Sequence, residues 1–337
     1  MRKKLLYIIL GLLSLTSCEE YYEPAIDAGT SVLVVESLLT NDQAQNFVKL
    51  SYSSSFYNSK IAMQVSGAST EIINEKNESF PGTETNDGYF LFDFSPVSGE
   101  KYKLRITLDS EIYESDFEMM PSLPSLDSVY SEPKTKYIYQ RNNSGAPTVI
   151  SMEGREIRVD ATATEQKAYY LFTRRTITET LEEPSFYVWH SSYSTGAFNT
   201  AGSKVYGNST KVEKHPITFF GTTGGMPVGW ILFINQYSIT RNAYDFMQQV
   251  NDQLAAEGRL FDPLYTQITG NIKCISDSSK AVVGLFDLRS YKQYRYFFKF
   301  YQYEQKMYQH QIETFYDIPD SGKVEAPQPE FWEEPKK

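Results

Sequence analysis

Hydrophobic and polar positions alternate along much of the chain after residue 30, and this pattern predicts β-strands. Phe47 and Lys49 alternate with Val48 and Leu50 in one such run. Runs rich in β-branched and aromatic residues are separated by turn signals, and they cover residues 31–40, 46–55, 67–74, 87–94, 99–108 and 111–119. Short strands at this spacing are typical of sandwich folds. The pattern therefore predicts an immunoglobulin-like or transthyretin-like β-sandwich over residues 31–121.

A second β-rich region follows a predicted linker that contains Pro121 and Pro124. Residues 155–163 and 168–180 are rich in strand-forming residues, and we expect them to pair as antiparallel neighbours. The segments that return to strand patterns later in this region are residues 230–240 and 281–305. The sequence thus predicts a larger, fibronectin-like β domain over residues 126–320, followed by an extended C-terminal tail over residues 321–337.

One segment of the second region has a helical period instead. Tyr244, Met247, Val250 and Leu254 recur at the spacing of one helix face, and Gly258 is a stop signal. The pattern predicts one α-helix near residues 242–257 in a chain that is otherwise mainly β.

Residues 184–229 show no clear period and are predicted to form a long irregular loop. The segment combines many Gly, Ser and Thr residues with aromatic ones, and binding loops often use aromatic side chains among small polar residues. It is therefore a candidate contact surface for a partner or a cargo molecule, with these candidate anchors: Tyr187, Trp189, His190 and Tyr206. The alternative is that these aromatic residues belong to strands and are buried in a core.

The N-terminus has the layout of a secretory signal peptide. A basic start precedes an apolar run at residues 5–15 that is too short to span a bilayer. Two small residues then precede Cys18, an arrangement that resembles a bacterial lipobox, where the cysteine thiol is acylated and becomes the new N-terminus. We therefore expect residues 1–17 to be a signal peptide, Cys18 to carry lipid, and residues 18–30 to form a tether. The alternative is an ordinary signal peptide with a chance cysteine.

The acidic pair that follows Cys18 bears on the cellular location of the protein. Glu19 and Glu20 are similar to the surface-export signal of lipoproteins in the Bacteroidota. This resemblance implies an outer-membrane, lipid-anchored protein that faces the cell exterior. A simple solvated tether is the other interpretation of the same two residues.

Charge narrows the range of partners. The 337-residue chain has a formal net charge of −10, and removal of the basic leader makes it more negative. An acidic surface repels phosphate backbones, so we expect no nucleic acid partner. It also opposes electrostatic binding to anionic lipids, which leaves the lipid on Cys18 as the predicted contact with the membrane.

The sequence motifs of common catalytic and metal sites are absent from the chain. His190, His215 and His310 each lack a second histidine or cysteine at zinc-ligand spacing, and no nucleophile-elbow, P-loop or zinc-protease motif occurs. We therefore predict no catalytic residue, no metal and no cofactor. With Cys18 acylated, Cys274 has no partner for a disulfide and is predicted to be a small buried residue.

Several motifs occur in the order of a known family. The most specific are G-N-I at residues 270–272, V-x-G-x-F at residues 282–286 and P-x-F-W at residues 329–332. On these motifs the chain resembles the Bacteroidota lipoproteins of the domain of unknown function 4249 family. Family members often carry a cysteine pair ahead of the last motif, and this chain does not. Such proteins are typically encoded beside TonB-dependent outer-membrane receptors, which implies an accessory role in uptake.

These observations lead to one leading functional hypothesis and two alternatives. The leading one is a non-enzymatic surface lipoprotein that helps a TonB-dependent transporter to capture nutrient cargo of unknown identity. The first alternative is a cell-surface hydrolase whose site is assembled from distant residues. The second is a structural or adhesion module of the cell surface.

Overall fold

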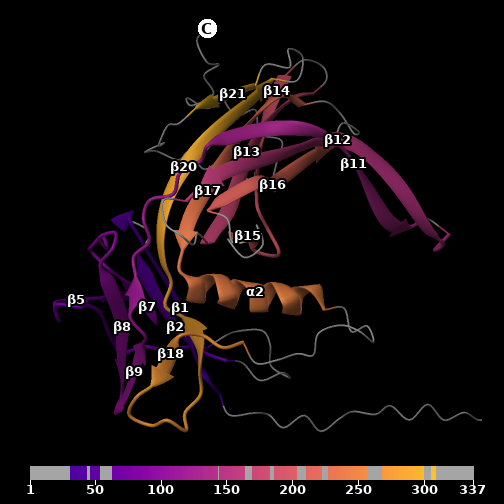
Figure 1. Ribbon diagram of the computed structural model, residues 1–337. Coiled ribbons are helices and arrows are strands. Elements are labelled where there is room, and N and C mark those ends of the chain that lie inside the picture. Colours follow the sequence, from indigo (N-terminus) through magenta and orange to yellow (C-terminus); the bar gives the residue numbers. More distant parts are fainter. Residues whose placement is uncertain are drawn as a thin grey trace, which may run out of the picture.

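The protein is mainly β, as the sequence pattern predicts, and one α-helix occurs within the part of the chain that is described (Figure 1). The computed structural model describes residues 31–43, 46–53, 63–142, 144–163, 169–182, 186–202, 210–221, 227–256, 268–299 and 305–308. In these segments, no helix is long and apolar enough to cross a membrane. Cys18 and the rest of the predicted leader and tether lie outside them.

A long mixed sheet runs through both halves of the molecule. Its main path, in spatial order, is β14 (Phe186–Tyr193), β13 (Tyr169–Glu182), β17 (Pro227–Ile239), β20 (Leu288–Lys299), β1 (Leu33–Thr40), β2 (Phe47–Tyr52), β7 (Tyr89–Leu91) and β6 (Thr83–Asn86). Four short strands pair beside this path: β15 (Asn199–Gly202), β19 (Val282–Leu285), β21 (Gln305–Tyr308) and β3 (Met63–Gln64). The two halves meet where β1 pairs with β20 in parallel, with Leu39 opposite Leu288 and Thr40 opposite Arg289.

In the N-terminal half, a second sheet faces this one. It contains β18 (Ile272–Cys274), β9 (Glu111–Ser115), β8 (Lys101–Leu108), β4 (Ser69–Asn74), β5 (Ser79–Pro81) and β10 (Glu118–Met119). The predicted period of two is confirmed in β8, where Tyr102, Leu104, Ile106 and Leu108 are buried. One hydrophobic core joins both sheets, and Cys274 is buried in it, as predicted. This half is therefore a β-sandwich with a closed core.

Two segments from far along the chain complete this sandwich. β18 pairs with β9, and β19 pairs in parallel with β1. Two of the family-like motifs lie here, and close packing explains their glycines. A Cβ on Gly284, whose φ is +143°, would lie 2.0 Å from the Val35 carbonyl oxygen, and one on Gly270 would lie 1.6 Å from the Gly284 carbonyl oxygen. Only glycine allows backbones to approach in this way.

We call the close contact of residues 270–271 with β19, and of β19 with β1, the seam. Asn271, in the G-N-I motif, fixes the seam with its side chain. Its Nδ2 donates to the Phe286 carbonyl oxygen at 3.0 Å, and its Oδ1 accepts from the Phe286 amide at 2.8 Å. Nδ2 also donates to Glu118 Oε1 at 3.0 Å, and the same oxygen accepts from Asn242 Nδ2 at 2.5 Å. A buried amide and a buried carboxylate thereby connect the sandwich with the helix of the other half.

That helix, α2 (Arg241–Ala255), confirms the predicted helical segment. Thr240 is its N-cap and accepts a hydrogen bond from the Ala243 amide. Tyr244 and Met247 are buried against β13 and β17, as their spacing predicts. Leu254, at the same helical spacing, is 60% exposed and does not belong to this buried face.

A third sheet packs on the part of the long sheet that β13, β17 and β20 form. It consists of β11 (Ser128–Arg141), β12 (Pro147–Thr162) and β16 (Lys211–Gly221). A second core lies between these two sheets, with Ile157 and Val159 of β12 against Phe172 and Leu232. The predicted pairing of residues 155–163 with residues 168–180 was wrong. β12 pairs with β11 and β16, while β13 pairs with β14, β15 and β17, because the two segments face each other across a core rather than along one sheet.

Candidate functional site

The predicted contact loop is mostly strand. Residues 184–229 contain β14, β15, β16 and the start of β17, so the prediction of a long irregular loop was wrong. For β15, β16 and β17 the physical reason is that their pairing partners are distant in sequence, whereas β14 forms a hairpin with the preceding β13 that the sequence pattern did not reveal. β16 pairs with β12, with partners that run from Thr162 opposite Lys211 to Gly154 opposite Gly221, and no local period indicates such a pairing.

Three of the four candidate anchors lie on one strand of this arrangement. Tyr187, Trp189 and His190 lie on β14, where their backbones are opposite Leu181, Glu179 and Thr178 of β13. Tyr206 lies outside the described residues. The structure thus places three of the four residues along a regular strand at one end of the long sheet. Their contact with a partner stays a prediction.

A different feature is the more prominent candidate for contact. The β11–β12 hairpin continues beyond the last residue of β12 that pairs with β16, which is Gly154. We call residues 135–153 the arm. In Figure 1 the arm extends away from the body of the molecule. Within the described residues, the strands of the arm pair only with each other.

Apolar side chains near the tip of the arm are uncovered. Tyr137 is 66% exposed, Tyr139 82% and Val149 51%, and the directly opposite pair Ile138 and Ile150 is also exposed. Contiguous exposed apolar surface of this kind marks interaction sites on soluble domains. The arm therefore offers aromatic and aliphatic anchors on a two-stranded support.

The sequence held a signal for the arm that was missed. Asn142 and Gly145 lie between two strand-like runs, which is a hairpin pattern. In the structure the Asn142 side-chain oxygen accepts from the Ser144 amide at 3.1 Å and from the Ala146 amide at 2.9 Å, while Gly145 has a φ of +81°. The turn is thus closed by the residues that the pattern offers.

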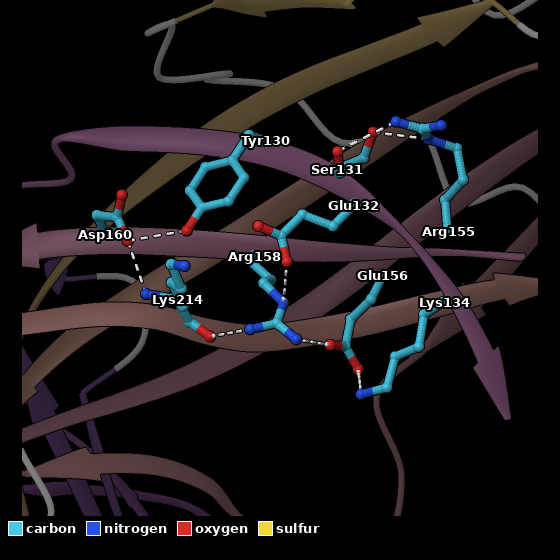
Figure 2. A network of polar contacts seen from close by, with 9 residues as sticks. All are labelled: Tyr130, Ser131, Glu132, Lys134, Arg155, Glu156, Arg158, Asp160 and Lys214. Carbon is cyan, nitrogen blue, oxygen red and sulfur yellow. Dashed lines mark hydrogen bonds and ion pairs between the residues drawn. The ribbon is translucent and has the colours of Figure 1, made fainter.

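A polar network stiffens the base of the arm (Figure 2). The carboxylate of Glu156, which is 5% exposed, pairs with Lys134 at 2.5 Å and with Arg158 at 2.7 Å. Arg158 also pairs with Glu132 at 3.2 Å and donates to the Lys214 carbonyl oxygen at 3.2 Å. These contacts join β11, β12 and β16, so the hairpin leaves the body from a three-stranded base that is fixed by side chains as well as backbone.

The electrostatic environment of the network favours its charged carboxylates. Burial opposes ionisation of Glu156, but hydrogen bonds and charges from Lys134 and Arg158 lower the pKa of its carboxyl group. Asp160 accepts from the Lys214 amide and from Tyr130, and its pKa is lowered despite burial. Burial and the neighbouring Asp160 raise the pKa of Tyr130 to about 12, so its hydroxyl remains a donor.

A groove of about 350 Å³ lies beside this base, between β16, β13 and the turn after β14. Its lining includes two cations, two aromatic rings and several hydroxyl or amide groups, among them Lys136, Arg174, Phe172, Phe219, Thr218 and Asn199. No acidic side chain is among the described residues that line it. The groove thus differs from the overall acidic surface of the chain.

His215 lies behind the groove and is neutral near pH 7. Its Nε2 donates to Asn199 Oδ1 at 2.7 Å, and its ring stacks on Phe172 at 5.1 Å between centroids. Burial lowers the pKa of His215 to about 4. It therefore orients Asn199 without adding charge to the groove.

The described residues contain no group of three or more His, Cys, Asp or Glu side chains that could hold a metal ion. Comparison with protein families gives one match: residues 19–295 match the model of a family described as Domain of unknown function (DUF4249). No curated protein matches the chain. The family description gives no activity, so the function must be argued from the surface and the groove.

Proposed function

We propose a function for a chain that belongs to the DUF4249 family: it is a lipid-anchored, non-enzymatic accessory protein of a TonB-dependent transporter in nutrient uptake. It is held at the outer membrane by acylated Cys18, faces the cell exterior, and contacts the transporter through the arm. The observation that carries this proposal is the set of uncovered apolar side chains on the arm.

The arm supports docking to a protein for energetic reasons. Tyr137 and Tyr139 present large apolar area with few rotatable bonds, which makes tyrosine a frequent hot-spot residue. The base network and the underlying core restrict the hairpin before a partner binds, so little conformational entropy is lost on association. A transporter barrel with extracellular loops offers a surface against which such a hairpin can lie.

The hydrolase alternative has less support from the electrostatics. A site that uses a carboxylic acid near neutral pH needs a raised pKa. Among the described carboxylates, every pKa shift that is resolved is downward, at Glu100, Glu114, Glu156, Asp160 and Asp277. These groups accept hydrogen bonds, and most also lie beside cations, as expected of structural residues. A purely structural module has less support as well, because it leaves the groove and the arm without a role.

The direct test is affinity capture of the tagged protein from detergent-solubilised outer membranes of the native organism. We expect mass spectrometry to identify a TonB-dependent β-barrel with the wild-type protein. The Tyr137→Ser/Tyr139→Ser double variant should lose most of this recovery, because each tyrosine at a hot spot contributes about 2 kcal/mol or more. Leu123→Ser is the matched control, since Leu123 is 59% exposed but lies outside the arm.

Repeated capture without a β-barrel would contradict the proposal, as would equal recovery with the arm variant and the wild type. The anchor is tested separately with the Cys18→Ala variant. This variant should be absent from the membrane fraction and should incorporate no labelled palmitate. Labelled palmitate on this variant would contradict the assignment of Cys18.

A further inference from the structure

Two cations in the groove have no carboxylate partner among the described residues. Arg174 donates to Thr176 Oγ1 at 3.2 Å, and Lys136 lies over the Phe219 ring at 4.6 Å from its centroid. The cations near Lys136 on the β11–β12 hairpin are different, because Lys134 and Arg158 both pair with Glu156. In a chain with a net charge of −10, carboxylates are abundant, so two cations in one groove that have no carboxylate partner among the described residues are a selective arrangement.

Of the two cations, Arg174 is the one whose charged form is opposed by burial. Its side chain is partly buried, and burial lowers the pKa of its guanidinium group. A guanidinium has five N–H donors, and here one of them has a protein acceptor among the described residues. Its planar fork is suited to a carboxylate or phosphate, which accepts two parallel hydrogen bonds. The remaining donors are therefore available to an anion.

The rest of the lining indicates what the anion is attached to. The ring of Phe219, which is partly exposed, provides apolar surface beside the cations, and Phe172 and Ile217 lie beneath it in the core with little exposed surface. The hydroxyl groups of Thr195 and Thr218 make no hydrogen bond within the described residues, so they too are available to a ligand. A volume of about 350 Å³ lies at the lower end of the range for small-molecule sites.

We propose that this groove binds a small organic anion, with its carboxylate or phosphate held between Arg174 and Lys136 and its apolar or planar body against Phe219. The inference rests on the proposed function only for its biological setting, where it names the chemical class of the cargo. Anion binding itself is a property of the isolated protein and needs no receptor.

The test is calorimetric titration of the protein that begins at Cys18, in the Cys18→Ala form, at low ionic strength. The probes are benzoate and phenyl phosphate, and benzyl alcohol is the neutral control of similar size. We expect saturable binding of at least one anion and a much weaker response to the alcohol. Preference for benzoate indicates a carboxylate cargo, and preference for phenyl phosphate indicates a phosphorylated one.

Substitutions of the two groove cations test whether the anion binds in this groove. Arg174→Gln and Lys136→Gln should each weaken anion binding by about tenfold or more, since a charge-assisted hydrogen bond is lost. Lys273→Gln removes the same charge at a position that is far from the groove in the sandwich, and it should bind as the wild type does. Because Lys136 is exposed, its variant remains decisive even if Arg174→Gln fails to fold.

Three results would overturn the proposal: no saturable binding of either anion, equal binding of benzyl alcohol, or unchanged affinity in a folded Lys136→Gln variant. None of them bears on receptor capture, which depends on the arm tyrosines. Likewise, loss of receptor capture in the arm variant leaves anion binding as it is. The two proposals can therefore fail separately.

Discussion

The N-terminal sandwich and the β11–β12–β16 sheet are built from similar strands, but they differ in how far their apolar side chains are covered and their charges are paired. In the sandwich, both sheets cover one core, and β18 and β19 arrive from far along the chain to complete it. Its surface cations are largely matched, as where Glu114 pairs with Lys103 at 2.7 Å and with Arg105 at 2.6 Å. In the three-stranded sheet, the base is packed and paired, but the apolar side chains of the arm are exposed, and two nearby cations have no carboxylate partner in the part of the chain that is described.

This difference separates residues that hold the fold from residues that are available for contacts. Buried apolar area and matched polar groups stabilise the sandwich, and they leave little for a ligand to gain. Exposed tyrosines and unpaired cations contribute little to folding, and their interaction energy is available to a partner. Substitutions in the two regions should therefore have opposite effects: loss of stability in the first and loss of binding in the second.

The largest effect is expected at Gly284 in the sandwich seam. Gly284→Ala places a Cβ 2.0 Å from the Val35 carbonyl oxygen at a φ of +143°, so β1 and β19 must separate. We expect the free energy of unfolding to fall by more than about 3 kcal/mol. Urea denaturation measures this. Gly99→Ala is the matched control, because Gly99 has a φ of +84° but open space around it, and its variant should lose only about 1 kcal/mol. Similar losses in both variants would contradict the role of the seam.

A smaller, pH-dependent effect is expected from His215, at the boundary between the packed core and the groove. Its pKa is about 4 in the folded chain and about 6.5 when unfolded, so the unfolded state binds the proton more readily. Stability is therefore fully present above pH 6.5 and falls as the pH drops toward 4, by up to about 3 kcal/mol. In His215→Gln the loss over this pH interval should shrink. An identical pH profile of thermal unfolding for variant and wild type would show that His215 is not the cause.

Removal of the charge of Glu156 tests the base of the arm. Glu156→Gln leaves Lys134 and Arg158 without their shared carboxylate, although both cations remain partly in contact with water. We expect a loss of about 1–2 kcal/mol, below the cost of breaking a fully buried pair. A double-mutant cycle with Lys134→Met measures the coupling of the pair. A coupling energy of zero would mean that the network does not stiffen the arm.

The smallest effect on stability is expected at the tip of the arm. Tyr137 and Tyr139 are exposed, so Tyr137→Ser/Tyr139→Ser should change the free energy of unfolding by less than about 0.5 kcal/mol per site. Thermal unfolding of the double variant beside Gly284→Ala measures the contrast directly. A large loss of stability in the arm variant would place these tyrosines in the packed part of the molecule and remove the difference between the two regions.

The sequence predicted the elements whose signal is local. β8 follows a period of two, and α2 has a helical period with a cap at Thr240, so both could be located from neighbouring residues. The seam between β1 and β19 and the pairing of β15 and β16 depend on partners that are far away in sequence. The sequence shows their glycines and aromatic residues, but it does not show which distant backbone packs against them.

The candidate sites divide in the same way. The aromatic residues Tyr187, Trp189 and His190 were chosen because they lie close together in sequence, and the structure places them along one strand. The groove could not have been predicted, because Lys136 and Arg174 come from different sheets and are brought together by packing. What identifies it is the absence of a carboxylate partner among the described residues, which only the folded arrangement reveals.

The most direct measurement of the central claim is site-specific photo-crosslinking in intact cells. A photoreactive phenylalanine analogue is placed at Tyr139 on the arm and, as a control, at Met63 of the sandwich, which is 64% exposed. Our account predicts a crosslink from position 139 to a TonB-dependent β-barrel and none from position 63. Crosslinks to the barrel from position 63 alone, or no barrel at either position, would contradict docking through the arm.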